Sequence, residues 1–147
     1  MELENIVKAN GELTIEIRDE NGNVKEVRHA KNLVVSVGKT FIASRVVGTA
    51  SAIMSHMAIG ISTQTPAAAD TALISEAGRV ALASGTNSAN AITYTATFPA
   101  GTGTGAITEA AVLNASSAGT MLCRTTFPVV NKAAGDSIAI TWVVTIS

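Results

Sequence analysis

The chain contains one cysteine and two histidines, the side chains most often used as nucleophiles, general bases and ligands of soft metal ions. Cys123 lies in an alternating apolar segment, and neither His29 nor His56 is near it in the sequence. Met54 and Met57 lie on either side of His56, but the chain offers no further ligands at a useful spacing. We expect Cys123 to be a small buried side chain, His56 to pack at the edge of a strand, and the chain to hold no metal ion.

Glu109 is the only carboxylate between Glu76 and Asp136, in a part of the chain with few charges. An isolated acid in a low-charge sheet is usually paired, and Arg79 or Arg124 could be its partner. It could instead face a partner protein or bind a cation. General acid catalysis would need a second carboxylate nearby and a cleft, and the sequence indicates neither. We therefore expect no catalytic residues.

Two glycine-containing segments resemble phosphate-binding motifs without their usual context. Gly38-Lys39-Thr40 precedes a predicted helix, but Leu33 stands where a P-loop has its first glycine. Gly101, Gly103 and Gly105 are followed by a predicted strand, whereas a dinucleotide site has a helix there. We expect no nucleotide and no cofactor at either segment. The second segment is a surface loop that could contact a partner protein.

The composition excludes several classes of protein. Of the 147 residues, 47% are apolar, 14% are charged and 3% are aromatic, so aliphatic residues must fill the core. The formal net charge of -1 gives no electrostatic footprint for nucleic acid or an anionic membrane. High hydrophobicity argues against disorder, and no apolar run approaches the about 18 residues of a membrane span. The first ten residues lack the apolar stretch of a secretory signal, so we expect cytoplasmic synthesis.

Charged residues concentrate near the N-terminus, where residues 1–48 hold fourteen of them. An apolar residue at every second position from residue 13 to 17 predicts a half-buried strand, and the Asn-Gly pair that follows is typical of a hairpin turn. We expect residues 1–31 to form a charged N-terminal arm with a β-hairpin, which could be removed without unfolding the body at residues 32–147. A hairpin alone is marginally stable and needs a surface to pack on. Its expected partner contacts are Leu13, Ile15, Ile17, Asn21, Gly22 and Arg28.

The body has the pattern of β-structure with one helix. Apolar residues at i, i+4 spacing, followed by Gly48, predict a helix at residues 36–47. The predicted strands are residues 57–61, 92–98, 107–114, 121–127 and 138–146, whereas residues 72–82 fit either a helix or a strand. Short strands at regular spacing favour a mainly β protein, an antiparallel β-sandwich of the jelly-roll or Greek-key kind with one short helix and an N-terminal β-hairpin.

The large apolar residues of these elements form the expected core. They are Phe41, Ile59, Phe98, Phe127 and Trp142. The opposite faces of the strands carry threonine, alanine and valine in place of lysine and glutamate. Depletion of charge is typical of the centre of an interface, so we expect another subunit to cover these faces.

A set of short segments carries a resemblance to a known family. They are Asn32-Leu33-Val34-Val35, Gly38-Lys39, Met57-Ala58-Ile59-Gly60, residues 63–73, residues 105–110, residues 113–122, residues 124–128 and Ile140-Thr141-Trp142. In this order and spacing they resemble a family of small virion proteins of tailed bacteriophages, and the similarity covers nearly everything after residue 32. Members of that family occur as free-standing structural proteins and as domains of tail-fibre or appendage proteins.

The resemblance implies a β-sandwich with a structural role in the particle and no active site. The chain lacks the repetitive shaft of a fibre, and its charged hairpin could lie across neighbouring subunits, which favours the capsid. We expect a capsid decoration (cement) protein, made in the host cytoplasm, that binds the outer surface of the virion head and bridges subunits of the major capsid protein. Proteins of this kind typically act as trimers at local three-fold positions.

The alternative is a tail-fibre or appendage module that binds a host receptor through the loops at residues 62–71 and 99–105. These loops lack the exposed aromatic residues that usually stack on sugars, which counts against this alternative. An enzyme would need convergent carboxylates or a nucleophile with a base, and we do not expect one.

Overall fold

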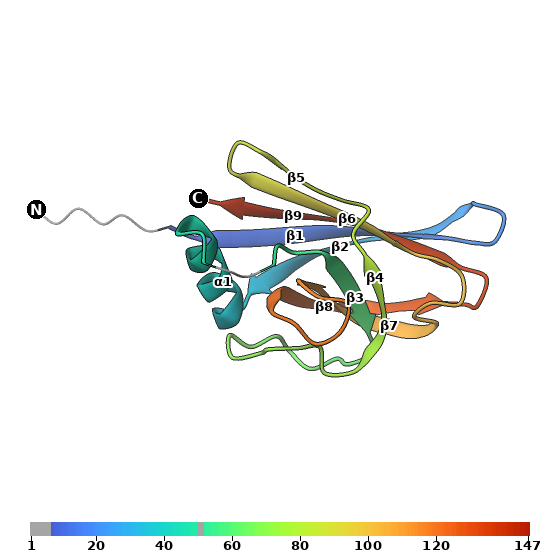
Figure 1. Ribbon diagram of the computed structural model, residues 1–147. Coiled ribbons are helices and arrows are strands. Elements are labelled where there is room, and N and C mark those ends of the chain that lie inside the picture. Colours follow the sequence, from blue (N-terminus) through green and yellow to red (C-terminus); the bar gives the residue numbers. More distant parts are fainter. Residues whose placement is uncertain (1–6, 50–51) are drawn as a thin grey trace, which may run out of the picture.

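The computed structural model describes residues 7–49 and 52–147, and this part of the chain is mainly β-structure with one short helix, as expected (Figure 1). The elements in chain order are β1 Ala9–Arg18, β2 Val24–Val34, α1 Ser36–Val46, β3 His56–Gly60, β4 Glu76–Ala81, β5 Ser84–Ser88, β6 Ala91–Phe98, β7 Gly105–Leu113, β8 Met121–Lys132 and β9 Ser137–Ile146.

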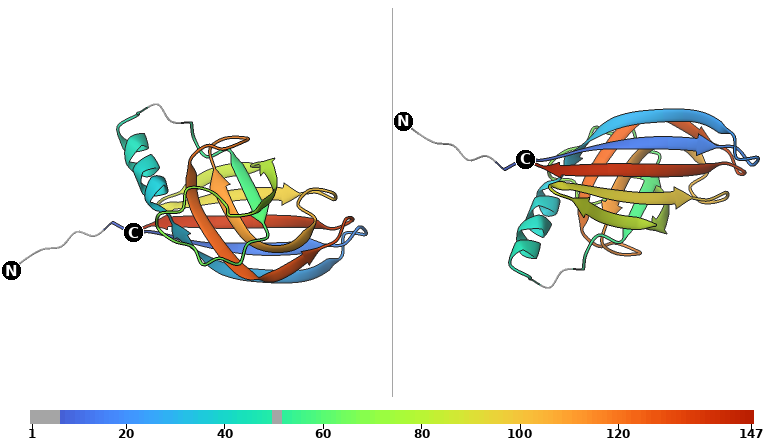
Figure 2. Two further views of the ribbon diagram at one scale, coloured as in Figure 1. Left: turned by 90° about the horizontal axis from the view of Figure 1, so that it is seen from below. Right: turned by 90° about the horizontal axis from the view of Figure 1, so that it is seen from above.

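The nine strands of the described residues form one antiparallel sheet in the order β4-β3-β7-β8-β2-β1-β9-β6-β5. This sheet curls into a half-barrel, with β1, β9 and β6 in one wall and β3, β7 and β8 in the other (Figures 1 and 2). The two edge strands, β4 and β5, follow one another in the chain, and only Leu82 and Ala83 separate them. The expected antiparallel sheet is confirmed, whereas a jelly-roll or Greek-key sandwich is not.

β2 joins the two walls. Eight of its first nine residues, all except Lys25, pair with β1, and its last two residues, Leu33 and Val34, pair with Arg124 and Cys123 of β8. β1 in turn pairs with β9 along its whole length. The N-terminal hairpin therefore lies in the middle of the sheet, and the expected boundary between residues 31 and 32 falls inside β2. The expectation of a separate arm is wrong for residues 7–31, and residues 1–6 of that arm lie outside the described residues.

Three rows of side chains across one wall fill the core of the half-barrel. Residues that lie directly opposite each other on β1, β9 and β6 all point inward and are buried. Cross-strand contacts of this kind are the main stabilising unit of a sheet. In the order β1, β9, β6, the rows are Leu13–Trp142–Tyr94, Ile15–Ile140–Ala96 and Ile17–Ile138–Phe98.

This core corrects one expectation. Leu13, Ile15 and Ile17 do not contact a partner, because their side chains point into the core and are only 2%, 1% and 1% exposed. The alternation of apolar residues predicts this strand correctly, but the surface that covers the three side chains is the chain's own β-structure. The expected core is otherwise confirmed, since four of its five members are buried and the fifth packs half-buried against the core. The buried members are Ile59, Phe98, Phe127 and Trp142, and the half-buried one is Phe41.

α1 confirms the predicted helix and ends one residue earlier than expected. Gly48 has a φ of +70° and its N–H donates to the carbonyl of Arg45 (3.2 Å), which terminates the helix as its sequence position predicts. At the other end of α1, Gly38 lies so close to the carbonyl of Leu122 that a Cβ would collide with it. α1 is therefore anchored to β8 through its first turn, and its last turn projects from the half-barrel (Figure 1).

Residues 72–82, which fitted either a helix or a strand, contain the edge strand β4. Five of the six residues of β4 pair with β3, with a register shift beside Gly60. β5 lies where no strand was predicted, because its sequence Ser-Gly-Thr-Asn-Ser has no apolar alternation and all five residues are exposed. As an edge strand of the described sheet, β5 pairs with β6.

Replacing Trp142 by alanine is expected to destabilise the protein by about 3–5 kcal/mol, because the indole is fully buried between Leu13 and Tyr94. The neighbouring Thr141 is exposed on the outer face, and Thr141→Ala is the matched control, expected to stay within about 0.5 kcal/mol. Urea unfolding of both variants measures the difference. An unchanged midpoint for Trp142→Ala would contradict this account of the core.

Removing residues 1–31 is expected to abolish folding. The deletion takes β1 and most of β2 out of the middle of the sheet, together with three core side chains. Circular dichroism and thermal unfolding of the remaining fragment test this, with a chain that starts at Val7 as the control, because that chain keeps β1 complete. A fragment 32–147 that unfolds cooperatively would show that the hairpin is an independent arm.

Candidate functional site

Glu109 is fully buried in β7, beneath the segment that connects β3 to β4. Its neighbour Ala110 points into the main core, so alternation along the strand directs Glu109 to the opposite face. The carboxylate there accepts backbone hydrogen bonds from Ser62 (3.3 Å), Ile74 (3.3 Å) and Ser75 (2.8 Å). Both ends of the connecting segment are therefore held by one side chain.

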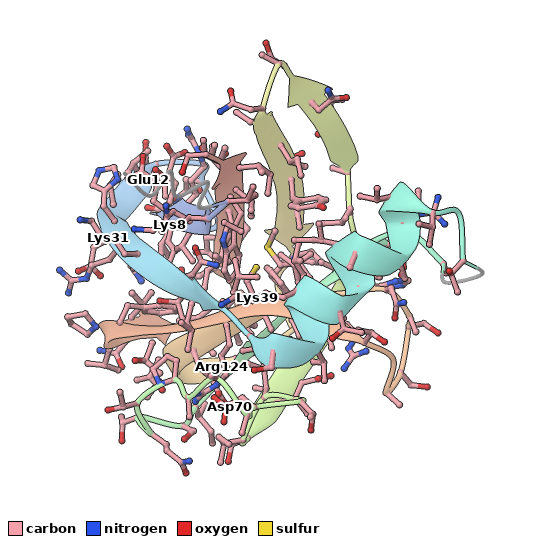
Figure 3. All side chains as sticks on the ribbon, turned by 90° about the vertical axis from the view of Figure 1, so that its left-hand side faces the viewer. Lys8, Glu12, Lys31, Lys39, Asp70 and Arg124 are labelled. Atoms are coloured by element: carbon pink, nitrogen blue, oxygen red, sulfur yellow. The ribbon has the colours of Figure 1, made fainter. Side chains whose placement is uncertain are left out.

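Arg124 of β8 is the charged partner of Glu109. Its Nε and Nη2 donate to Glu109 Oε2 at 3.2 and 3.0 Å, and both side chains are 0% exposed. Nη1 donates to Asp70 Oδ2 at 3.0 Å, and Nη2 also donates to the carbonyl of Gln64 at 2.9 Å. Figure 3 shows Arg124 and Asp70 side by side at the edge of the connecting segment. The guanidinium thus joins two carboxylates and the backbone of the segment.

Of the two arginines considered as partners of Glu109, the structure selects Arg124. Arg79 pairs instead with Glu76 (2.6 Å) and donates to two carbonyls of the loop before β8. Asp70, the third member of the cluster, was not foreseen. It stands in an alanine-rich loop whose sequence carries no signal for burial against a strand 54 residues away.

Gly60 at the end of β3 makes room for the cluster. A Cβ at this position would collide with Glu109 Oε1 and with the carbonyl of Ser75, so only glycine fits. The register of β3 and β4 also shifts at this residue. Gly60 is therefore both the site of a strand irregularity and the point where the backbone comes close to the buried cluster.

The arrangement is a structural clamp. The Glu109 carboxylate accepts hydrogen bonds from three backbone N–H groups and from Arg124, and the side chain has no exposed surface. The clamp holds residues 62–75 against the outer face of β3, β7 and β8, where Leu73 completes a second apolar cluster with Ala111 and Met121. The loop at residues 62–71, a candidate receptor-binding loop, is therefore tied to the sheet.

The glycine-rich loop after β6 is also fixed. The buried Lys132 donates through Nζ to the carbonyl of Pro99 (2.9 Å), and burial lowers the pKa of this amine. Gly103 is buried against Ile59, so it cannot contact a partner, which corrects that expectation. Gly101 is exposed and Gly105 is half-buried, and their contact with a partner stays a prediction.

The tip of the β1–β2 hairpin projects from the end of the half-barrel opposite α1 (Figure 1). Asn21 and Gly22 are exposed there, on a turn in which Asp19 Oδ1 accepts the N–H of Asn21 (2.9 Å). Hydrogen bonds from the backbone of the turn lower the pKa of Asp19. Arg28 is partly exposed and pairs with Glu26 (2.6 Å). Partner contacts at Asn21, Gly22 and Arg28 stay a prediction.

Cys123 and the histidines lie apart from one another. Cys123 is completely buried, and burial raises the pKa of its thiol far above the ordinary range. His56 is hydrogen-bonded to Ser55 Oγ (2.8 Å) and His29 to Thr14 Oγ1 (3.1 Å). Within residues 7–49 and 52–147, no group of three or more histidine, cysteine or acidic side chains is arranged to hold a metal ion.

The α1 end of the half-barrel carries an exposed apolar surface. Val7 and Leu33 line one groove beside α1, Val46 and Ile53 line a second, and Val47 directly follows α1. The exposed fractions of these five side chains run from 36% to 81%. We call these five residues the apolar end. They make up half of the ten exposed large hydrophobic side chains in the described part of the chain. Several exposed apolar side chains at one end of a molecule commonly mark a contact with another molecule.

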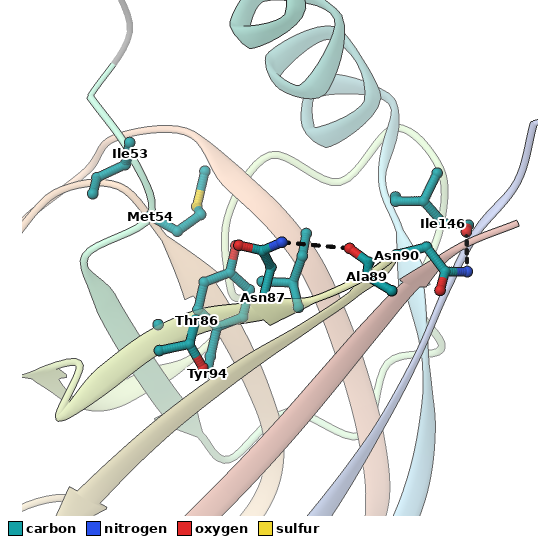
Figure 4. A pocket seen from close by; sticks show the side chains of 10 residues that line it. Ile53, Met54, Thr86, Asn87, Ala89, Asn90, Tyr94 and Ile146 are labelled. Carbon is teal, nitrogen blue, oxygen red and sulfur yellow. Dashed lines mark hydrogen bonds between the residues drawn. The ribbon is translucent and has the colours of Figure 1, made fainter.

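Three hollows surround the apolar end. A groove of 560 Å³ lies between α1 and three strand ends, namely the start of β1 and the ends of β2 and β9. A second groove, of 360 Å³, also borders α1 and is lined by Phe41 and Val46. Ile42 of α1 lines both. The third hollow, of 460 Å³, lies beside the β5–β6 turn, with Tyr94 and Met54 in its lining and Asn87 and Asn90 around them (Figure 4). Burial raises the pKa of the Tyr94 hydroxyl to about 12.

Comparison with known proteins identifies no family. No family model matches the chain, and no curated protein or solved structure matches it either. No helix within residues 7–49 and 52–147 is both long and apolar enough to cross a membrane. The resemblance to bacteriophage virion proteins therefore stays a prediction.

Replacing Arg124 by methionine is expected to destabilise the protein by about 3–5 kcal/mol, because Glu109 would be left buried without its counter-charge. Adding Glu109→Gln to that variant should recover part of the loss, since the unpaired charge is then removed. Urea unfolding measures both effects, and limited proteolysis should show cleavage within residues 62–75 of the single variant.

The matched control is Arg18→Met, which breaks an exposed ion pair with Glu16. Pairs of that kind contribute at most about 1 kcal/mol. Equal stabilities of the Arg124 and Arg18 variants would show that the buried cluster is not the clamp described here.

Proposed function

We propose that the protein is a structural component of a tailed-bacteriophage particle that acts by binding other protein subunits. The observation that carries this proposal is the apolar end, where Val7, Val46, Val47 and Ile53 are each at least 65% exposed around three hollows. Apolar surface that is exposed to water favours association, because a partner that covers it removes it from water. The resemblance of the segments after residue 32 to virion proteins supports the same role.

Within the particle, we propose a capsid decoration (cement) protein that binds the outer surface of the head. Its partners are subunits of the major capsid protein and further copies of this chain, with a trimer as the expected assembly. Such a protein would stabilise the head by mass action, because it binds the assembled shell and not the dissociated subunits. The outer faces of β6 and β9 are suited to a flat contact, since their side chains are Thr93, Thr95, Thr97, Ala139, Thr141, Val143 and Thr145.

The second candidate is a tail-fibre or appendage module that binds a host receptor. The hollow beside the β5–β6 turn favours it, because Asn87, Asn90 and Thr86 bring amide and hydroxyl groups to a lining that contains Tyr94. Small polar ligands bind to sites of this composition, with an apolar floor and a few placed polar groups. The loops at residues 62–71 and 99–105 support this candidate less, since both are tied to the sheet.

Immunogold electron microscopy of purified virions, with an antibody against this chain, distinguishes the two candidates. Dense label over the heads is expected for a decoration protein. Label confined to the tails would overturn the capsid role and support the appendage module, and virions without any label would overturn both.

Val46→Asp is expected to weaken binding to particles that lack this protein by about tenfold or more, because it places a charge in the apolar end. The control is Val24→Asp, which makes the same change at the opposite hairpin end, where Val24 is 47% exposed. Cosedimentation of each variant with the particles measures the affinities. Loss of binding by the Val24 variant alone would move the contact to the hairpin tip.

A further inference from the structure

The larger groove at the apolar end combines an apolar lining with positive charge. Its apolar walls are formed by Val7, Leu33 and Val34 on the strand side and by Ile42 and Ala43 on the α1 side. Figure 3 looks onto this end of the molecule, with Lys8 and Lys39 labelled. The groove of 560 Å³ thus lies between α1 on one side and the adjoining ends of β1, β2 and β9 on the other.

The positive charge at the groove comes from Lys8 and Lys39. Both are exposed, one beside β1 and the other on α1, and both line the groove. In residues 7–49 and 52–147 neither lysine forms an ion pair, and no acidic side chain lines the groove. A matching occupant is a chain segment with apolar side chains and carboxylates, because it would cover the apolar walls and pair with the lysines.

Residues 1–6 of the chain have this chemistry. Their sequence is Met-Glu-Leu-Glu-Asn-Ile. An extended segment of this sequence would present Met1, Leu3 and Asn5 on one side and Glu2, Glu4 and Ile6 on the other. We propose that residues 1–6 of one copy bind in this groove of a second copy. The inference rests on the proposed assembly of copies of this chain and deepens it by assigning the contact.

The course of the chain at Lys8 favours a second copy over the same one. The N–H of Lys8 donates to the carbonyl of Ser147 (2.7 Å), and the N–H of Ser147 donates back to Lys8 (2.8 Å), so β1 pairing continues straight to this point. Val7, the next residue outward, is 78% exposed. To enter its own groove the chain would have to reverse at once, whereas a neighbouring copy receives the segment without a turn.

The first test compares the full chain with a chain that starts at Val7, by sedimentation velocity. The full chain is expected to be oligomeric and the shortened chain monomeric, with equal circular dichroism because β1 is intact. A monomeric full chain, or a shortened chain that is equally oligomeric, would overturn the proposal.

The second test uses a labelled synthetic peptide of residues 1–6 with the shortened chain, followed by fluorescence anisotropy. Binding is expected, and it should weaken as salt rises because the contact is partly ionic. Lys8→Glu with Lys39→Glu should weaken it by about tenfold. The control is Lys31→Glu, an exposed lysine outside the groove, which should leave binding unchanged. Equal effects of the two changes would place the peptide elsewhere.

A charge exchange in the full chain completes the test without any truncation. Glu2→Lys with Glu4→Lys is expected to give a monomer, and adding Lys8→Glu with Lys39→Glu should restore the oligomer. Failure of this restoration would overturn the assigned contact. Oligomers that exchange residues 1–6 but do not bind particles would instead overturn the virion role and leave this inference standing.

Discussion

The buried pair of Arg124 and Glu109 is the interaction on which the outer layer of this structure depends. A charge removed from water is costly unless it is paired and its remaining hydrogen-bonding capacity is filled. Here Arg124 also reaches Asp70 and a carbonyl, while Glu109 accepts three backbone N–H groups. The hydrogen bonds that offset the desolvation of this ion pair come from residues 62–75. They form only when this segment lies across β3, β7 and β8. The segment, the glycine at the end of β3 and the second apolar cluster therefore form one cooperative unit.

Local elements could be predicted from the sequence because their signals are local. Alternation marked β6, β8 and β9, apolar spacing with Gly48 marked α1, and the isolation of Glu109 indicated a charged partner. The curl of the sheet could not be predicted, because it depends on β2 pairing with β1 and then with β8. Alternation of apolar residues shows that one face of a strand is covered, but it does not show which part of the structure covers it. The predicted partner contact of Leu13 is wrong for this reason. The apolar end also lacked a signal, since it is assembled from four separate parts of the chain.

The two ends of the half-barrel offer different surfaces to other molecules. The hairpin tip is polar and closed by turn hydrogen bonds, whereas the α1 end is apolar, hollowed and bordered by Lys8 and Lys39. Between them, the outer face of β6 and β9 carries threonine, alanine and valine and is nearly free of charge. A protein with this distribution is suited to end-on contact through its apolar end and flat contact through its outer face. A structural protein that links several neighbours needs two such contacts.

The short link of two residues between β4 and β5 limits the addition of strands from other chains to the edges of this sheet. An open sheet exposes two unpaired edges, and each can template the addition of strands from other chains. Here the edges belong to consecutive strands, and three Cα–Cα steps hold Ala81 and Ser84 within about 11 Å. Since strands in a sheet lie about 4.8 Å apart, that gap admits at most one further strand at this end. At this corner of the sheet, the connectivity therefore leaves little room for strands of other chains to add between the two edges.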